Sequence, residues 1–155
     1  MIDSPLGNIL LEADFKGITI AQFSWLENVP TESTNTILNQ CAQEFHEYFE
    51  DKRMFFTVPL SLHGTDFQTR VWEELQNIPY GTTTTYLKMA RKLGDEKVIR
   101  AAASANGKNP IAIIVPCHRV IGTNGDLVGY AGGLDKKKWL LEHEGALNRD
   151  QLGLF

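Results

Sequence analysis

A cysteine and a histidine stand side by side in "IVPCHRV", residues 114–120. Pro116 fixes its own φ and has no N–H, so we expect Cys117 just beyond the end of a strand, at the edge of a site. A cysteine thiolate is a strong nucleophile, but it needs a base or a cation nearby to exist at neutral pH. His118 is the candidate base. Adjacent side chains usually point apart, so its action on the thiol requires a turn or a bridging water.

The dipeptide alone favours a plainer interpretation, a buried and unreactive cysteine beside an exposed histidine. The last expected helix, residues 135–145, bears on this choice. It carries lysines at 136–138 in its first turn and Glu142 and Glu144 in its last. These charges oppose the helix dipole, at about 0.3–1 kcal/mol each when exposed. They are either simply solvated, or the lysines meet phosphates and Glu144 orients His118, which would complete a nucleophile, base and carboxylate.

The expected helix at residues 95–107 is rich in alanine, and Arg100 is its main long polar side chain. Helices that recognise bases in the major groove present Asn, Gln, Arg or Lys to the base edges. Small residues instead permit close approach to a narrow groove, with one arginine projecting into it. A packed alanine-rich helix with a surface arginine is the alternative.

Three further polar side chains lie near glycines or prolines. Tyr86 and Tyr130 each follow a run of small or flexible residues, where a core position is the simpler interpretation. Asn109 precedes Pro110, and asparagine at such a place commonly bonds the backbone of a turn.

The elements that would position these groups fall in two parts. In the first, residues 8–13 and 17–23 predict a β-hairpin, and residues 31–51 predict an amphipathic helix. Cys41 lies on the apolar stripe of that helix and is expected to be an inert core thiol. A further strand is expected at residues 53–60. A linker follows.

The second part begins at residue 63 and is mainly helical. Three successive helices, separated by a Gly-containing turn and by Gly94, indicate a helix-turn-helix. A buried strand is expected before Cys117. The expected elements are helices at residues 65–78, 85–94, 95–107 and 135–145 and a strand at residues 110–115.

Composition limits the class of protein. The 155 residues are 43% hydrophobic, enough for a core without disulfides, and the two cysteines are expected to stay reduced in a cytoplasmic protein. No apolar run reaches the length of a membrane span. The net charge of −4 argues against nucleic acid, but residues 1–80 carry −8 and residues 81–155 carry +4. That asymmetry indicates an anionic partner for the second half, unless it reflects ordinary solvated surfaces.

Four segments together resemble one family, the O6-alkylguanine-DNA alkyltransferases, also called methylated-DNA–protein-cysteine methyltransferases. They are "PYGTTTTY", "RAAASANGKNPIAIIVPCHRVIG", "GYAGG" and "WLLEHEG". The similarity covers about residues 66–145 closely and the N-terminal third weakly, through "DSPLG". It implies an α/β (α+β) protein. Its N-terminal lobe, residues 1–62, would be a small sheet with a helix resembling ribonuclease H, and residues 63–155 would form a winged helix-turn-helix-like lobe with the active site.

The resemblance assigns a role to each candidate residue. Cys117 would accept the alkyl group, with His118 as its base through a water and Glu144 orienting His118. Tyr86 would help to flip the nucleotide and donate to the guanine ring, and Asn109 would brace the active-site turn. The guanine pocket would be formed by the Val120 carbonyl, Tyr130 and Ala131. DNA contacts are implied for Arg100, Ala101, Ala103, Asn106 and Thr123, with Arg100 filling the gap in the duplex.

The implied reaction is a single-turnover repair. The methyl group on guanine O6 lies inside the base stack, so the nucleotide must be flipped out. Transfer to the thiol gives a thioether that water does not hydrolyse, and no cofactor is expected. The implied substrates are O6-methylguanine and O4-methylthymine in duplex DNA, and the protein is expected to be a monomer with no membrane association.

Some relatives differ at positions that matter for these expectations. Where Ala131 stands some have serine, so here the backbone N–H would bond the guanine oxygen. Some bind zinc through N-terminal cysteines and histidines. This lobe offers Cys41 and His46 without a second cysteine, so no metal is expected.

Three other classes of protein fit the sequence less well. A non-catalytic lesion-binding relative would have another residue, usually tryptophan, in place of Cys117. A cysteine hydrolase using Cys117, His118 and Glu144 would need an acyl substrate and would turn over repeatedly. A transcription factor would need a recognition helix with more polar side chains for the base edges than the alanine-rich helix has.

Overall fold

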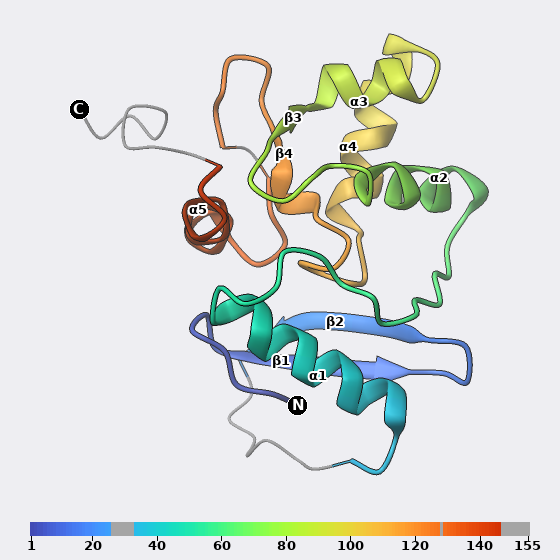
Figure 1. The fold of residues 1–155 in the computed structure, drawn as a ribbon. Helices are drawn as coiled ribbons and strands as arrows, with labels where there is room; N and C mark the ends of the chain where they lie inside the picture. Colours follow the sequence, from blue (N-terminus) through green and yellow to red (C-terminus); the bar gives the residue numbers. More distant parts are fainter. Residues whose placement is uncertain (26–32, 128, 147–155) are drawn as a thin grey trace. The chain divides into compact units, whose positions relative to one another are not determined.

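Two alternating β-rich runs form a hairpin at the start of the chain, as expected. The computed structural model describes residues 1–25, 33–127 and 129–146, so residues 31–32 of the first expected helix and residues 147–155 lie outside the described part. Strands β1 (Asn8–Ala13) and β2 (Ile18–Ser24) pair antiparallel, and Asp14 N–H donates to the Gly17 carbonyl at 3.0 Å to close the turn. Helix α1 (Thr36–Phe49) packs on this hairpin (Figure 1).

The chain folds into two units. The first comprises Met1–His63 with Pro110–Ile114, and the second comprises Gly64–Asn109 with Val115–Phe155. In the first unit, the core includes Ile9, Ile18, Phe45 and Tyr48. Cys41 is buried on the same face of α1, and burial, followed by the charge of Glu44, raises the pKa of its thiol to about 12. The predicted core position of Cys41 is therefore confirmed.

The strand expected at residues 53–60 is wrong. Only Leu60 makes a bridge, to Ile18 of β2. The buried carboxylate of Glu44 explains why, because it accepts the N–H groups of Thr57 at 2.7 Å and Val58 at 3.0 Å. Donors that a strand would offer to a neighbour are thus satisfied by a side chain from α1.

The strand expected at residues 110–115 is also wrong. Ile111 makes one bridge to Ala21 of β2, and the chain then turns. Ile114 N–H donates to the Ala112 carbonyl at 2.8 Å, and Ile113 between them has φ +72°. A β-branched residue in that region is strained, and this i→i+2 bond with positive φ is a γ-turn. The apolar residues are buried without forming a strand.

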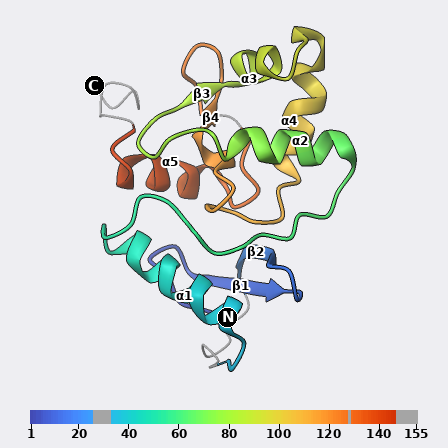
Figure 2. The same cartoon turned by 45° about the vertical axis from the view of Figure 1, so that its right-hand side comes forward.

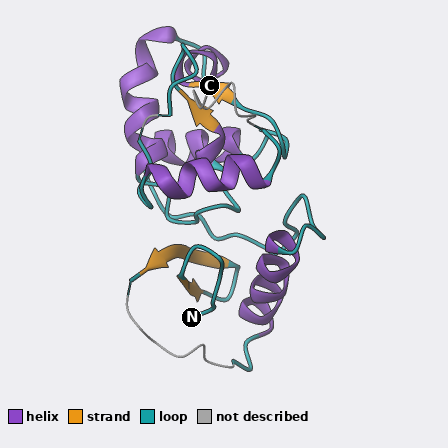
Figure 3. Cartoon of the chain, turned by 90° about the vertical axis from the view of Figure 1, so that its left-hand side faces the viewer, coloured by secondary structure: helices purple, strands orange, loops and turns teal. Residues whose placement is uncertain are grey.

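The second unit is mainly helical (Figure 3). Its elements are α2 (Asp66–Leu75), β3 (Thr84–Thr85), α3 (Tyr86–Lys92), η1 (Glu96–Val98), α4 (Ile99–Gly107), η2 (Cys117–Arg119), β4 (Val120–Ile121) and α5 (Leu134–His143). Thr65 caps α2 in a capping box with Gln68, and Trp72 Nε1 of α2 donates to the Ala105 carbonyl of α4 at 2.9 Å. The short strands β3 and β4 pair in parallel between the helices (Figure 2). The mixed α/β class is confirmed.

Candidate active site

Cys117 begins the 3₁₀ helix η2, directly after a tight turn at Pro116. Pro116 has φ −83° and ψ 64°, and Cys117 N–H donates to the Val115 carbonyl at 2.8 Å. This is an inverse γ-turn. Asn109 Nδ2 donates to the same carbonyl at 2.8 Å, so one acceptor fixes both the turn and the end of the preceding segment. Cys117 follows the turn with only 6% of its surface exposed.

Burial raises the pKa of the Cys117 thiol above its usual value. Three smaller effects oppose the shift: a hydrogen bond from the Asn109 side chain, the positive charge of Lys137, and a backbone hydrogen bond. The net rise keeps Cys117 a thiol at neutral pH. A reaction at this sulfur therefore needs a group that removes the proton.

His118 and Glu144 form a buried pair. His118 Nε2 lies 2.8 Å from Glu144 Oε2, and both side chains are shielded from solvent. The ionised carboxylate can only accept, so Nε2 carries the hydrogen and Nδ1 is left with its lone pair. Among the described residues no hydrogen bond reaches His118 Nδ1. Burial is the main reason that the pKa of His118 is lowered, which keeps the imidazole neutral and able to accept a proton.

Arg119 holds the other side of the same carboxylate. Its Nε donates to Glu144 Oε1 at 2.8 Å and its Nη2 to Oε2 at 3.0 Å, while Nη1 donates to the Ile78 carbonyl at 2.7 Å. Burial alone would raise the pKa of Glu144, but the hydrogen bonds and charges of His118 and Arg119 hold it well below the usual range. The carboxylate therefore stays ionised. Arg119 was not among the residues expected in the site, although it stands beside His118 in the motif.

Lys137 corrects an expectation. The lysines at 136–138 were candidates for phosphate contacts, but Lys137 is fully buried. Its Nζ donates to the Val120 carbonyl at 2.6 Å and to the Gly129 carbonyl at 3.2 Å. Burial lowers the pKa of its ammonium to about 8, although the negative charge of a Cys117 thiolate would raise it. Lys137 thus links Val120, which directly follows η2, to Gly129. Because three lysines follow one another at 136–138, the sequence did not show that Lys137 is the buried one.

The two candidate tyrosines both lie close enough to Cys117 for its charge to affect them. Burial raises the pKa of each phenol, most strongly for Tyr130, and the charge of Cys117 adds to both shifts. Asn106 Nδ2 donates to the Tyr86 hydroxyl at 3.4 Å. Asn106 is only 3% exposed, so it is better placed to orient Tyr86 than to touch DNA.

Three of the remaining residues expected to meet DNA lie on α4, and the fourth, Thr123, follows β4. Arg100 and Ala101 are exposed, Ala103 is half-buried, and Thr123 is exposed in the turn that follows β4. Ala131 is exposed, whereas Val120 is buried with its carbonyl held by Lys137. Within the described residues, no group of three or more His, Cys, Asp or Glu side chains could hold a metal ion.

Both parts of the chain match known family models. Residues 66–146 match the model of the 6-O-methylguanine DNA methyltransferase, DNA binding domain, and residues 1–62 match that of the ribonuclease-like domain of the same proteins. This chain belongs to that family. The resemblance seen in the sequence is therefore confirmed.

Individual relatives are similar to this chain over nearly its full length. The methylated-DNA–protein-cysteine methyltransferase of Methanosarcina acetivorans is 43% identical, covering 94% of this chain and 97% of that protein. The structure of Mycobacterium tuberculosis OGT in complex with DNA is 41% identical, covers 99% of this chain and 96% of its own, and has a TM-score of 0.83. The O6-methylguanine DNA methyltransferase of Methanococcus jannaschii is 27% identical, covers 90% of this chain and 89% of its own, and has a TM-score of 0.66. No helix of the described residues is long and apolar enough to cross a membrane.

Proposed function

We propose that this protein repairs O6-alkylguanine in duplex DNA by moving the alkyl group onto Cys117. The observation that carries the proposal is a buried thiol whose neighbour in the chain, His118, is bonded to buried Glu144 at 2.8 Å. The family and the DNA-bound relative support it. O4-methylthymine is a second expected substrate, and the protein acts as a monomer in the cytoplasm, where its thiols stay reduced.

The proton on Cys117 leaves first. No hydrogen bond joins the side chains of Cys117 and His118 among the described residues, so a water carries the proton to Nδ1 of His118. Glu144 then stabilises the imidazolium, and Arg119 keeps Glu144 ionised and in place. Lys137 and Asn109 favour the thiolate.

The sulfur attacks the methyl carbon in the next step. The S–C bond forms as the C–O6 bond breaks, and guanine leaves with the bonding electrons, as an anion that needs a proton. Tyr86, which Asn106 orients, donates a proton to the ring. The proton that His118 took from Cys117 then passes through water to the Tyr86 oxygen, so both side chains end neutral. The product is S-methylcysteine. Because nothing in this chemistry cleaves the thioether, each molecule acts once.

The substrate must be held outside the stack. The Val120 carbonyl has a second lone pair beside the one that Lys137 occupies, and this can accept from the guanine amine. Tyr130 and the backbone N–H of Ala131 complete the pocket. Arg100 enters the duplex from the small-residue face of α4, with Ala101, Ala103 and Thr123 against the backbone. Flipping costs a few kcal/mol, less at a damaged pair.

A turnover experiment tests this function. The protein is mixed with a tenfold excess of duplex containing O6-methylguanine, and repaired guanine is counted over time. We expect at most one repaired base per protein molecule, with none for Cys117→Ser and full activity for the control Cys41→Ser. Repeated turnover by the wild type, or repair by Cys117→Ser, would contradict the proposal.

A further inference from the structure

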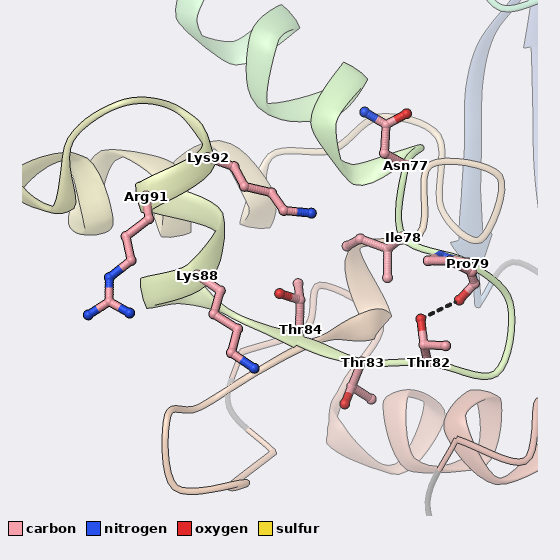
Figure 4. A pocket seen from close by; sticks show the side chains of 9 residues that line it. All are labelled: Asn77, Ile78, Pro79, Thr82, Thr83, Thr84, Lys88, Arg91 and Lys92. Atoms are coloured by element: carbon pink, nitrogen blue, oxygen red, sulfur yellow. Dashed lines mark hydrogen bonds between the residues drawn. The ribbon is translucent and has the colours of Figure 1, made fainter.

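Positively charged side chains gather along α3, where a cavity opens beside the helix. A cavity of about 400 Å³ is formed by the end of α2, the loop before β3, β3 itself and α3 (Figure 4). Its lining includes three cations and three threonines but no carboxylate. The lining residues that matter most are Ile78, Thr83, Thr84, Lys88 and Lys92.

The cations share one helix face because they stand three and four residues apart. Lys88, Arg91 and Lys92 lie within two turns of α3, and the helix itself contains no acidic residue. Like charges at this spacing repel each other. Arg91 and Lys92 at least lie near the C-terminal end, where the helix dipole favours cations. Lys88 lies in the first turn, where the dipole opposes a cation, so its position is not explained by the helix.

Existing partners neutralise this group incompletely. Arg91 Nε binds Glu96 at 2.7 Å, and Lys92 Nζ lies 3.8 Å from Glu74, a loose pair in which the lysine is exposed and the glutamate half-buried. Lys88 forms no ion pair with any residue that the structure describes. In Figure 4 the ammonium groups of Lys88 and Lys92 lie on either side of Thr84, whereas Arg91 points away from it.

Hydroxyl groups stand beside the ammonium groups. The Thr82 hydroxyl is occupied, since it donates to the Pro79 carbonyl at 2.8 Å. The hydroxyls of Thr83 and Thr84 donate to no acceptor among the described residues. Both threonines line the cavity together with Ile78. Figure 4 shows their side chains on opposite sides of the loop, with Thr84 between the two ammonium groups.

We infer that this cavity binds a phosphate group, held by Lys88, Lys92 and the hydroxyl of Thr84. A phosphate offers several acceptor oxygens and a charge that would relieve the repulsion along α3. The volume exceeds that of one phosphate, and Ile78 suits an adjoining sugar. A backbone phosphate of bound DNA fits best, since the first helix of a helix-turn-helix crosses the DNA backbone. The assignment of this phosphate to DNA rests on the proposed function.

Salt dependence of DNA binding tests the inference. Affinity for an undamaged duplex is measured by fluorescence anisotropy at several salt concentrations for wild type, Lys88→Gln/Lys92→Gln, and the control Lys16→Gln/Lys52→Gln, which removes equal charge from the first unit. Losing one phosphate contact should make the slope of log K against log salt less negative by about 1 in the first variant alone. Circular dichroism verifies that both variants are folded.

A titration of the wild type distinguishes the source of the phosphate. Inorganic phosphate is added while the amide resonances of Thr83 and Thr84 are followed by NMR. Shifts at these amides with an unchanged salt slope would support a site for free phosphate instead of DNA. Equal slopes in all three proteins and no shifts would overturn the inference. Methyl transfer to Cys117 is assayed separately, so its failure would contradict the proposed function and leave this result standing.

Discussion

His118 Nε2 lies 2.8 Å from Glu144 Oε2, and the same carboxylate accepts two hydrogen bonds from Arg119. All three side chains are buried. The carboxylate thus serves two purposes: it fixes the tautomer of His118 and it compensates the charge of Arg119. Loss of that single negative charge should therefore affect both the reaction and the stability of the fold.

Glu144→Gln should slow methyl transfer and destabilise the protein. Without the carboxylate the imidazolium loses its counter-charge, and general base catalysis of this kind contributes about 10²–10⁴-fold. Arg119 is left buried without a partner charge, a defect that costs about 3–5 kcal/mol. The measurements are the single-turnover rate on O6-methylguanine duplex and urea unfolding.

The matched control is Glu142→Gln, which removes the same charge from an exposed position on α5. It should change both quantities little. Equal behaviour of the two variants would mean that the buried pair contributes nothing to the reaction.

Lys137→Met should shift the reactivity of Cys117 to higher pH. The buried ammonium lowers the pKa of the Cys117 thiol, so its removal leaves less thiolate at any pH near neutrality. We expect a severalfold slower reaction of Cys117 with iodoacetamide at neutral pH, measured as a pH profile by peptide mass spectrometry. Lys137→Arg should restore part of the rate. Lys138→Met, the neighbouring control, should keep the wild-type pH profile. If Lys137→Met also showed the wild-type profile, Lys137 would have no electrostatic effect on Cys117.

His118 should make the protein less stable as pH falls below about 6.5, the pKa of an unfolded histidine. Its pKa is lowered in the folded state, mainly by burial. Between the two pKa values the unfolded chain therefore binds a proton that the folded protein does not. Stability is then lost on acidification at no more than about 1.4 kcal/mol per pH unit from this group.

The comparison is urea unfolding of wild type and His118→Gln at pH 7, 6 and 5. The variant should lose less stability over this range, because the group that titrates is gone. Parallel curves would show that His118 does not contribute to the pH dependence.

Arg100→Ala should separate base flipping from chemistry. If Arg100 fills the gap left by the flipped nucleotide, its loss should slow transfer from duplex DNA by about 10-fold or more, since vacating the stack costs a few kcal/mol. Alkylation by free O6-benzylguanine needs no flipping and should be nearly unchanged. Arg70→Ala, an exposed arginine of the same unit, is the control. An equal loss with both substrates would contradict the proposed role.

Much of the fold was predictable because local sequence determines it. The hairpin at β1 and β2 follows from alternation and a turn, and α2 follows from the Thr65 cap and its apolar face. Both failures were apolar runs with β-branched residues. At residues 53–60 the buried Glu44 takes the backbone donors, and at residues 110–115 the chain turns at Ile113 with positive φ. Neither a carboxylate thirteen residues away in the sequence nor a strained turn produces a local sequence pattern from which the loss of the strand could be predicted.

The site was predictable only in part, for a similar reason. Cys117, His118 and Glu144 could be grouped because one helix held an acidic residue where its dipole disfavours it. Lys137 could not be told from its neighbours, since helix spacing alone does not say which lysine faces the interior. The structure distinguishes it by the carbonyls of Val120 and Gly129.

The central claim is that Cys117 itself receives the methyl group. The most direct test is mass spectrometry of the protein after reaction with duplex containing O6-methylguanine, followed by proteolysis. We predict that the intact mass rises by one methylene group, that the added mass lies on the peptide containing Cys117, and that the peptide containing Cys41 is unchanged. Repaired DNA with an unmodified Cys117 peptide, or a reduced wild-type protein that gains no mass, would contradict the account.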